Sequence, residues 1–288
     1  MQTLLTLGLQ KDYELLDSGE GEKLERFGDF ITARPDPQAL WLKSQPSLWA
    51  KAHTRYVRTG PKTGAWSNAD KLPKSWQIVV GGFTFNIRLS TFKHTGIFPE
   101  QQPNWQWLRD VIKKQARELN IINLFGYTGG ASLACAKAGA KVTHVDSSKT
   151  VVTWAHENAD ASGLGDKPIR WILEDAYAFV KKELKRGKKY DGIIMDPPTF
   201  GHGTRGELWK IEKQFTDLVE DCNKLLSDNP ALYLVNGYAA GYSSITYANN
   251  IASLIEKFGG AIEHGELTIE ETCGKRLLPA GIFARWAR

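Results

Sequence analysis

The chain has 288 residues, of which 42% are hydrophobic and 24% are charged, a composition typical of a globular protein with one large or two modest domains. Its formal net charge of +5 permits an anionic partner such as RNA without requiring one. No apolar run approaches the length of about 20 residues that crosses a bilayer, and the N-terminus does not resemble a signal peptide, so no membrane association is expected. Three widely separated cysteines argue against disulfides or a metal site and favour the cytoplasm.

Residues 1–95 are expected to form a small β-rich domain that could contact the substrate. Within it, residues 76–80 and 83–89 predict a hairpin, because the two glycines between them can adopt the positive φ values of a tight turn. The region also contains Trp41, Trp49, Trp66 and Trp76. These side chains could stack on bases, but filling a small core is the preferred interpretation.

Residues 96–288 are expected to form an α/β domain. Apolar runs predict strands at 121–126, 141–146, 169–174, 190–196 and 231–237. Helices are predicted to begin near residues 130, 148, 176 and 207 and to cover 243–258, with late strands at 261–271 and 281–287. This alternation predicts a Rossmann-like sheet that is mostly parallel, with an antiparallel last strand. Ligands of such sheets bind at the carboxyl ends of the parallel strands.

The stretch 121–132 is typical of a nucleotide-binding βαβ unit. An apolar strand meets a glycine turn that opens a helix, and the next strand ends in Asp146, about twenty residues after the first glycine. Asp146 could accept hydrogen bonds from ribose hydroxyls or cap the helix that begins at Lys149. The spacing from the glycines favours ribose binding.

Two later strand ends carry further acidic residues. Asp175 could accept a hydrogen bond from an adenine amine, cap the helix that begins at Ala176, or do both. The fourth strand ends in Asp196, and two prolines then fix a stiff turn that presents carbonyls and a carboxylate at the expected active-site edge.

Taken together, residues 123–130, 144–146, 173–175 and 195–200 resemble the class I S-adenosylmethionine-dependent methyltransferases. More narrowly, they are similar to the bacterial large-subunit ribosomal RNA methyltransferases of the cytosine-C5 and guanine-N7 type. The resemblance covers roughly residues 90–288 and is more specific for the cofactor than for the substrate. It implies a seven-stranded methyltransferase sheet, S-adenosylmethionine as the cofactor and RNA as the partner.

The resemblance also implies roles for individual residues. The backbone that would hold the methionine part of the cofactor is that of Phe125, Gly126, Tyr127, Thr128, Gly129 and Gly130, and Gln102 would cover that end. The residues that would hold the nucleoside are Asp146, Ser147, Glu174, Asp175 and Ala176. The catalytic residues would be Asp196, Pro197 and Pro198, and Phe200 or Tyr127 could stack on the acceptor base. His202, Arg205 and Lys210 could bind phosphates or form a solvated surface.

The sequence departs from the cytosine-C5 enzymes, which need a cysteine nucleophile after strand five. Residues 234–239 contain no cysteine, Cys135 and Cys222 fall in predicted helices, and Cys273 lies near the last strands. We therefore expect methylation of an RNA base without a cysteine nucleophile. Methylation of a small molecule or protein is the alternative. The irregular glycine spacing and the Asp-Pro-Pro turn disfavour a nicotinamide-dependent oxidoreductase.

Overall fold

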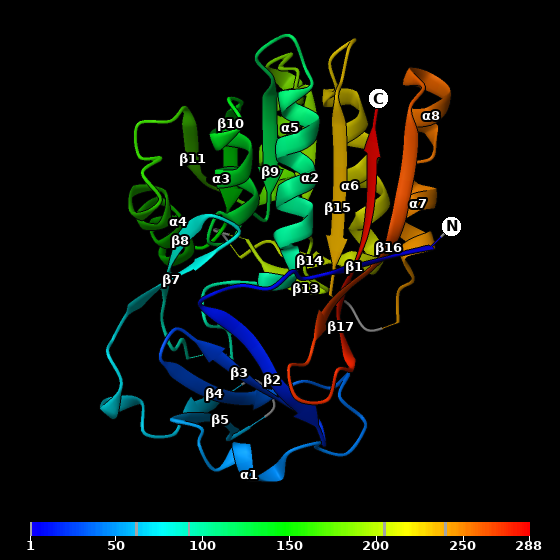
Figure 1. The fold of residues 1–288 in the computed structure, drawn as a ribbon. Helices are drawn as coiled ribbons and strands as arrows, with labels where there is room; N and C mark the ends of the chain where they lie inside the picture. Colours follow the sequence, from blue (N-terminus) through cyan, green and yellow to red (C-terminus); the bar gives the residue numbers. More distant parts are fainter. Residues whose placement is uncertain (1, 61–62, 92, 204–205, 239–240) are drawn as a thin grey trace. The chain divides into compact units, whose positions relative to one another are not determined.

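The computed structural model describes residues 2–60, 63–91, 93–203, 206–238 and 241–288 (Figure 1). These residues divide into two compact units: unit 1 has residues 2–5, 104–267 and 281–288, and unit 2 has residues 6–103 and 268–280. The sequence predicted a single boundary after residue 95. In the structure the segment 96–103 groups with unit 2, where the buried Glu100 lies near Lys23 and Arg34. The hairpin tip at 268–280 groups with unit 2 as well.

Unit 1 is built on a sheet in which the described residues form eight strands in the order β1-β16-β17-β15-β12-β9-β10-β11. The strands are β1 (Gln2–Thr6), β9 (Asn120–Leu124), β10 (Lys141–Asp146), β11 (Ile169–Leu173), β12 (Gly192–Met195), β15 (Leu232–Gly237), β16 (Ala261–Glu270) and β17 (Leu277–Ala287). Neighbours from β15 to β11 are parallel, and β17 is antiparallel to β15, as predicted. The predicted count of seven is corrected to eight, because β1 pairs with β16 and covers what would otherwise be an exposed sheet edge.

Helices cover both faces of this sheet (Figure 1). They are α2 (Gln102–Lys113), α3 (Gly130–Lys137), α4 (Lys149–Ala161), α5 (Ala176–Lys185), α6 (Ile211–Leu225), α7 (Ser244–Asn250) and α8 (Ser253–Phe258). Ile193 and Met195 of β12 join the core cluster formed with α5 to α8, whereas Ile194 joins the cluster formed with α2 and α3. Successive side chains of the central strand therefore point to opposite faces, both of them buried.

Two predicted helices differ from the structure. The segment predicted to be helical from residue 207 begins as a hairpin of β13 (Phe200–His202) and β14 (Leu208–Lys210), and the helix starts only at Ile211. The predicted helix at 243–258 is divided into α7 and α8. The amide groups of Ile251 and Ala252 donate to carbonyls three residues earlier, and these tighter turns interrupt the α-helical hydrogen bonding.

Unit 2 is rich in β-structure, as the sequence predicted. Its larger sheet has the order β2-β3-β4-β5-β6, and β7 and β8 form a separate hairpin. The elements are β2 (Tyr13–Gly19), β3 (Glu22–Phe27), β4 (Phe30–Pro35), α1 (Pro46–Trp49), β5 (Thr54–Arg58), β6 (Gly64–Trp66), β7 (Trp76–Val80) and β8 (Phe83–Ile87), with short 3-10 turns at Ala69–Lys71 and Pro99–Gln101. Gly81 and Gly82 close the β7–β8 hairpin with φ values of 60° and 81°, which suit a tight turn.

The four tryptophans of the N-terminal region form hydrogen bonds with other residues of unit 2. Their indole nitrogens donate to Ser18 O (Trp41), Asp17 Oδ2 (Trp49), Ser90 O (Trp66) and Phe27 O (Trp76). Trp49 and Trp66 are buried. These contacts agree with the preferred interpretation, in which large side chains fill a small core.

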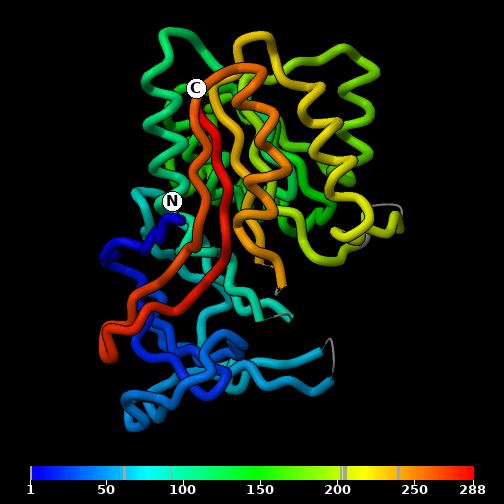
Figure 2. Tube along the Cα trace, turned by 90° about the vertical axis from the view of Figure 1, so that its right-hand side faces the viewer, coloured from blue at the N-terminus to red at the C-terminus, as the bar shows by residue number. Residues whose placement is uncertain are grey.

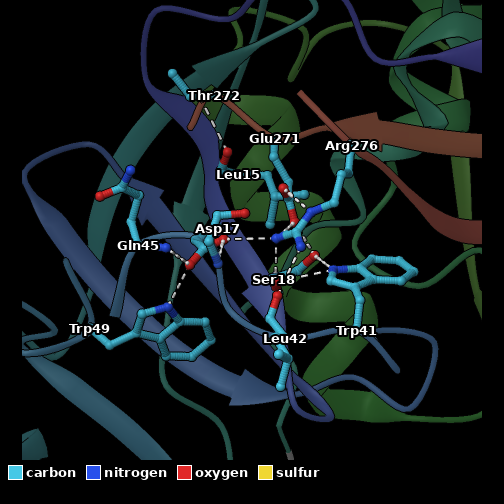
Figure 3. A network of polar contacts seen from close by, with 11 residues as sticks. Leu15, Asp17, Ser18, Trp41, Leu42, Gln45, Trp49, Glu271, Thr272 and Arg276 are labelled. Carbon is cyan, nitrogen blue, oxygen red and sulfur yellow. Dashed lines mark hydrogen bonds and ion pairs between the residues drawn. The ribbon is translucent and has the colours of Figure 1, made fainter. Parts of the chain in front are cut away.

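A buried ion-pair network ties the 268–280 segment to β2 (Figure 3). Arg276 binds Glu271 at 2.8 Å and Asp17 at 3.1 Å, and it also donates to the carbonyls of Ser18 and Leu42 at 2.8 Å. Both carboxylates are completely buried. One guanidinium therefore binds two buried carboxylates, which gives each of them a cationic hydrogen-bond partner.

Replacing Arg276 by methionine should destabilise the protein strongly, because Asp17 and Glu271 would stay buried without their cation. We expect a loss of about 3 kcal/mol in the free energy of unfolding, measured by urea denaturation. Lys275→Met is the matched control: Lys275 is exposed and pairs with Glu270 at 3.6 Å, so its loss should cost less than about 1 kcal/mol. Equal effects of the two substitutions would contradict this account.

Candidate active site

The loop of residues 125–130, here called the glycine loop, joins β9 to α3 in an uncommon backbone conformation. Phe125 and Tyr127 have φ values of 56° and 48°, and Gly129 has a φ of 96°. Left-handed conformations are unfavourable for side chains other than glycine and cluster at functional sites. The Gly126 amide donates to Val145 O at 3.0 Å, which anchors the loop to β10.

Two glycines of the loop make room for side chains of the protein. A Cβ atom on Gly126 would lie 2.4 Å from the His144 ring, and one on Gly130 would lie 2.3 Å from the Trp105 indole. Both distances are too short for any larger residue. From sequence, the glycines were expected to let the backbone approach a ligand; in the structure they let the loop rest on His144 and Trp105.

A buried polar chain lies beneath the glycine loop. Asn123 Nδ2 donates to Ser132 Oγ at 2.9 Å, and Ser132 Oγ lies 2.9 Å from His144 Nδ1. The three residues come from β9, α3 and β10, so the chain links the elements on both sides of the loop. Burial lowers the pKa of His144 to about 3, which keeps its ring neutral at physiological pH.

Asp146 at the end of β10 holds the glycine loop through its carboxylate. Its Oδ2 accepts from the Tyr127 amide at 3.0 Å, and its Oδ1 accepts from the Ser148 amide at 2.9 Å. Burial raises the pKa of Asp146, while these amides act to lower it. The helix cap of α4 is Ser148, whose side chain accepts from Val151 N. The Ser147 amide also bonds to this carboxylate, and Asp146 is thus not the cap of α4 but a hub of backbone amides beside the glycine loop.

Asp175 is the cap of α5, as its position before the helix suggested. Its Oδ1 accepts from the Ala178 amide at 2.8 Å. The other carboxylate oxygen, Oδ2, takes no part in this capping bond. A Cβ atom on Gly203, in the turn after β13, would lie 3.0 Å from that oxygen, so the backbone of the β13–β14 segment passes close to it.

A cleft of about 330 Å³, including space open to solvent, lies among these strand ends. Its lining residues are Phe125, Asp146, Ser147, Asp175, Ala176, Pro198, Gly201 and Trp209. The structure therefore brings together six of the residues singled out from the sequence. The other members of the glycine loop, with Glu174, Asp196, Pro197 and Phe200, are in unit 1 but not in this lining, and Gln102 belongs to unit 2. The Glu174 carboxylate pairs with Lys182.

Trp209 of β14 is a residue of the cleft that the sequence did not reveal. Its indole nitrogen donates to Pro198 O at 2.6 Å, and its ring packs on Phe125 with the centroids 5.4 Å apart. Trp209 thereby connects the glycine loop to the Asp-Pro-Pro turn (residues 196–198). The only sequence signal was a large aromatic residue shortly after this turn, within a segment that was predicted to be helical.

The cysteines lie apart from this cleft or outside its unit. Cys135 and Cys222 are buried in α3 and α6, as predicted, and burial raises the pKa of both thiols. Cys273 is exposed and belongs to unit 2, where its amide donates to Leu16 O at 3.2 Å. Of the proposed phosphate ligands, Arg205 and the side chain of His202 lie outside the described residues, and Lys210 ends β14.

The geometry is that of a nucleotide-binding α/β protein. Two carboxylates follow neighbouring parallel strands, and the aromatic rings of Phe125 and Trp209 form apolar walls beside them. Carboxylate oxygens can accept from hydroxyl and amino groups, while aromatic walls can bury a base or a sugar. The residues present therefore fit an adenosine-containing cofactor.

Comparison with known proteins defines the family. The family model of S-adenosylmethionine-dependent methyltransferases matches residues 23–240, and the chain belongs to this family. A solved S-adenosylmethionine-dependent methyltransferase from Agrobacterium tumefaciens is 38% identical, with a TM-score of 0.92 over 100% of this chain and 94% of that chain. A putative methyltransferase complexed with SAH shares the fold, with a TM-score of 0.66 at 20% identity over 96% of this chain and 75% of that chain.

The curated relatives match a shorter part of this chain. The ribosomal RNA large subunit methyltransferase K/L of Shewanella frigidimarina is 34% identical over 157 residues, which are 54% of this chain and 21% of that protein. The match thus spans about a fifth of the length of that relative. Within the described part of the chain, no helix has the length and apolar character needed to span a membrane.

Stability should fall in acid because His144 is neutral when folded. Its pKa is about 3 in the folded protein and about 6.5 when unfolded, so below pH 6.5 the unfolded state binds a proton that the folded state does not. We expect this group to remove about 2 kcal/mol of stability between pH 7 and pH 5. Urea denaturation at both pH values should show a correspondingly smaller loss for His144→Asn. The same loss in both proteins would contradict the assignment.

Proposed function

We propose that this methyltransferase acts on a base of RNA, in particular ribosomal RNA, without a cysteine nucleophile. The observation that carries the choice of RNA is a basic segment of unit 2, described below. The printed names of the curated relatives, which are ribosomal RNA methyltransferases, support the same substrate class. The free cysteines, Cys135, Cys222 and Cys273, support the cytoplasm as the compartment.

The basic segment comprises residues 51–74 and is called here the basic arm. Its cationic residues are Lys51, Arg55, Arg58, Lys62, Lys71 and Lys74, and Asp70 is its one acidic residue. Its excess of positive charge equals the net charge of +5 of the entire chain. Such a one-sided segment attracts a polyanion, whereas a small neutral substrate would gain little from it.

The structure shows how the basic arm presents these charges. β5 and β6 pair antiparallel, with Arg58 opposite Gly64, and extend side by side (Figure 2). Lys51, Arg58, Lys71 and Lys74 are exposed, and Lys62 lies outside the described residues. Arg55 pairs with Glu22. Arg58 lies on this hairpin, whereas Lys51 precedes it and Lys71 and Lys74 follow it, and all four exposed cations are available to phosphates.

We propose that the cleft of unit 1 holds the cofactor through its two carboxylates. Asp146 would accept from the ribose hydroxyls, and Asp175 Oδ2 from the adenine amine, with Ser147 and Ala176 beside them. The glycine loop would hold the methionine part, and Glu174 and Gln102 retain their proposed roles at the adenine and methionine ends. When bound, S-adenosylmethionine supplies a methyl group already activated by its sulfonium, so the protein must mainly position the acceptor and exclude water.

The Asp-Pro-Pro turn is the proposed acceptor site. Trp209 binds the Pro198 carbonyl. The Asp196 carboxylate and the Pro197 carbonyl would accept hydrogens from an exocyclic amine. A ring nitrogen that attacks the methyl group through its lone pair would need neither of these two acceptor groups. Phe200 is 45% exposed, and we propose that it stacks on the acceptor base. A paired base would first have to leave its duplex, at a cost of a few kcal/mol.

Asp146→Asn should weaken binding of S-adenosylhomocysteine by about 10- to 100-fold, because a hydrogen bond to a charged group contributes about 1.5–3 kcal/mol. Isothermal titration calorimetry would measure this. Binding of the 2′-deoxy and 3′-deoxy analogues of the ligand distinguishes the loss of a ribose hydrogen bond from a disturbance of the glycine loop. The unaltered protein should discriminate against at least one of them, and the variant should not.

Asp160→Asn is the control for this measurement, because it makes the same chemical change at an exposed position of α4. It should leave the affinity for S-adenosylhomocysteine unchanged. Equal affinities for the ligand and both deoxy analogues in the unaltered protein would refute the ribose contact.

Replacing Lys51, Arg58 and Lys74 by glutamine should weaken RNA binding and reduce its salt dependence. For single-stranded RNA, each lost phosphate contact should lower the slope of log K against log salt by about 0.7, so the three together should lower it by about 2. Fluorescence anisotropy with a labelled ribosomal RNA fragment at several salt concentrations would give the slope.

The matched control replaces Lys185, Lys188 and Lys189, which lie near the amino ends of the parallel strands, at the edge opposite the cleft. It removes the same charge from the other unit and should change the slope by less than half as much. If the two triple variants behave alike, the basic arm is not the RNA-binding surface.

A further inference from the structure

A buried tyrosine of α7 has a hydroxyl group that forms no hydrogen bond with the described part of the chain. Tyr247 is 1% exposed, and its hydroxyl oxygen has no hydrogen-bond partner among the described residues. Its ring packs against Phe215 of α6 with the centroids 5.1 Å apart. A phenylalanine would make the same apolar contacts without burying a polar group, so packing alone does not explain a tyrosine here.

The position of this hydroxyl is defined by β15. A Cβ atom on Gly237 would lie 2.3 Å from the Tyr247 hydroxyl, so this oxygen rests directly on the last residue of that strand. In the parallel pairing of β12 with β15, Met195 is opposite Val235. Asp196 and Gly237 therefore follow at the same sheet edge, which places the hydroxyl where the Asp-Pro-Pro turn begins.

The Tyr247 hydroxyl stays protonated in this environment. Burial raises the pKa of Tyr247 to about 12, and the nearby negative charge of Asp196 contributes to the increase. Tyr242 is the other ionisable group that influences it. Tyr247 therefore keeps its proton at physiological pH and can donate a hydrogen bond.

We propose that Tyr247 is a positioning residue for methyl transfer: its hydroxyl donates to the Asp196 carboxylate once the methyl acceptor occupies the Asp-Pro-Pro turn. This inference rests on the acceptor role proposed for that turn. The bond would fix the carboxylate in the orientation in which it receives the hydrogens of the acceptor. Gly237 serves the same arrangement, because any side chain there would displace the hydroxyl.

Tyr233 provides a matched comparison. It is a fully buried tyrosine of the same core cluster, and its hydroxyl, which likewise has no hydrogen-bond partner among the described residues, lies near the thiol of Cys222. It lies near the start of β15, paired with Ile193, whereas Gly237 ends the strand. Tyr233→Phe thus makes the same chemical change in the same core, away from the Asp-Pro-Pro turn.

The experiment compares Tyr247→Phe and Tyr233→Phe with the unaltered protein. Radiolabelled S-adenosylmethionine is added to an extract of cells from which this gene has been deleted, and the label is counted separately in RNA, protein and small molecules. Rates at increasing extract concentration separate kcat from KM. Calorimetry with S-adenosylhomocysteine and thermal unfolding accompany each variant.

For Tyr247→Phe we expect a thermal midpoint at least as high as that of the unaltered protein, unchanged S-adenosylhomocysteine affinity and a kcat at least about tenfold lower. Tyr233→Phe should retain its kcat. A normal kcat for Tyr247→Phe, or an equal fall for Tyr233→Phe, would overturn the proposal. Label in protein or small molecules instead of RNA would refute the proposed substrate, while the comparison of rates would still decide the role of Tyr247.

Discussion

The hydrogen bond from the Tyr127 amide to the Asp146 carboxylate is the contact on which the candidate site depends. It helps to hold Phe125 and Tyr127 in left-handed conformations, which cost about 1–3 kcal/mol each without support. In that conformation the Phe125 ring packs on Trp209, which in turn binds the Pro198 carbonyl. A single carboxylate at a strand end therefore supports both the proposed donor side and the proposed acceptor side of the cleft.

The sequence predicted those parts of the site that depend on local spacing. Asp146 and Asp175 could be placed because each follows an apolar strand, and parallel strands end at one edge. Trp209 could not, because its role depends on a contact with Pro198, eleven residues earlier, across a hairpin that resembled the start of a helix. The packing of Gly126 and Gly130 against His144 and Trp105 was equally hidden, since it arises only when separate elements come together.

At the level of the fold, the alternation of strands and helices was enough to predict the parallel sheet, but not its eighth strand. β1 pairs with β16, which is more than 250 residues away in the chain, and its five residues carry no pattern of their own. The burial and pairing of charged residues in unit 2 could not be predicted from the sequence either. Despite burial, Arg34 and Lys23 lower the pKa of Glu25 to about 2, whereas burial raises that of Glu100 to about 7. The pKa values of two glutamates in one unit thus differ because folding gives them different neighbours.

The interleaving of the two units limits how the protein can be divided. A fragment that begins at residue 104 would retain residues 268–280 but lose β2, so Glu271 and Arg276 would keep each other and lose Asp17 and Ser18. A fragment that ends at residue 103 would leave Asp17 without its arginine. To express the cleft-bearing unit by itself, residue 267 would have to be joined to residue 281 by a short turn, with the first strand supplied separately. Such a protein combines an internal deletion with a separate first strand, which truncation alone cannot produce.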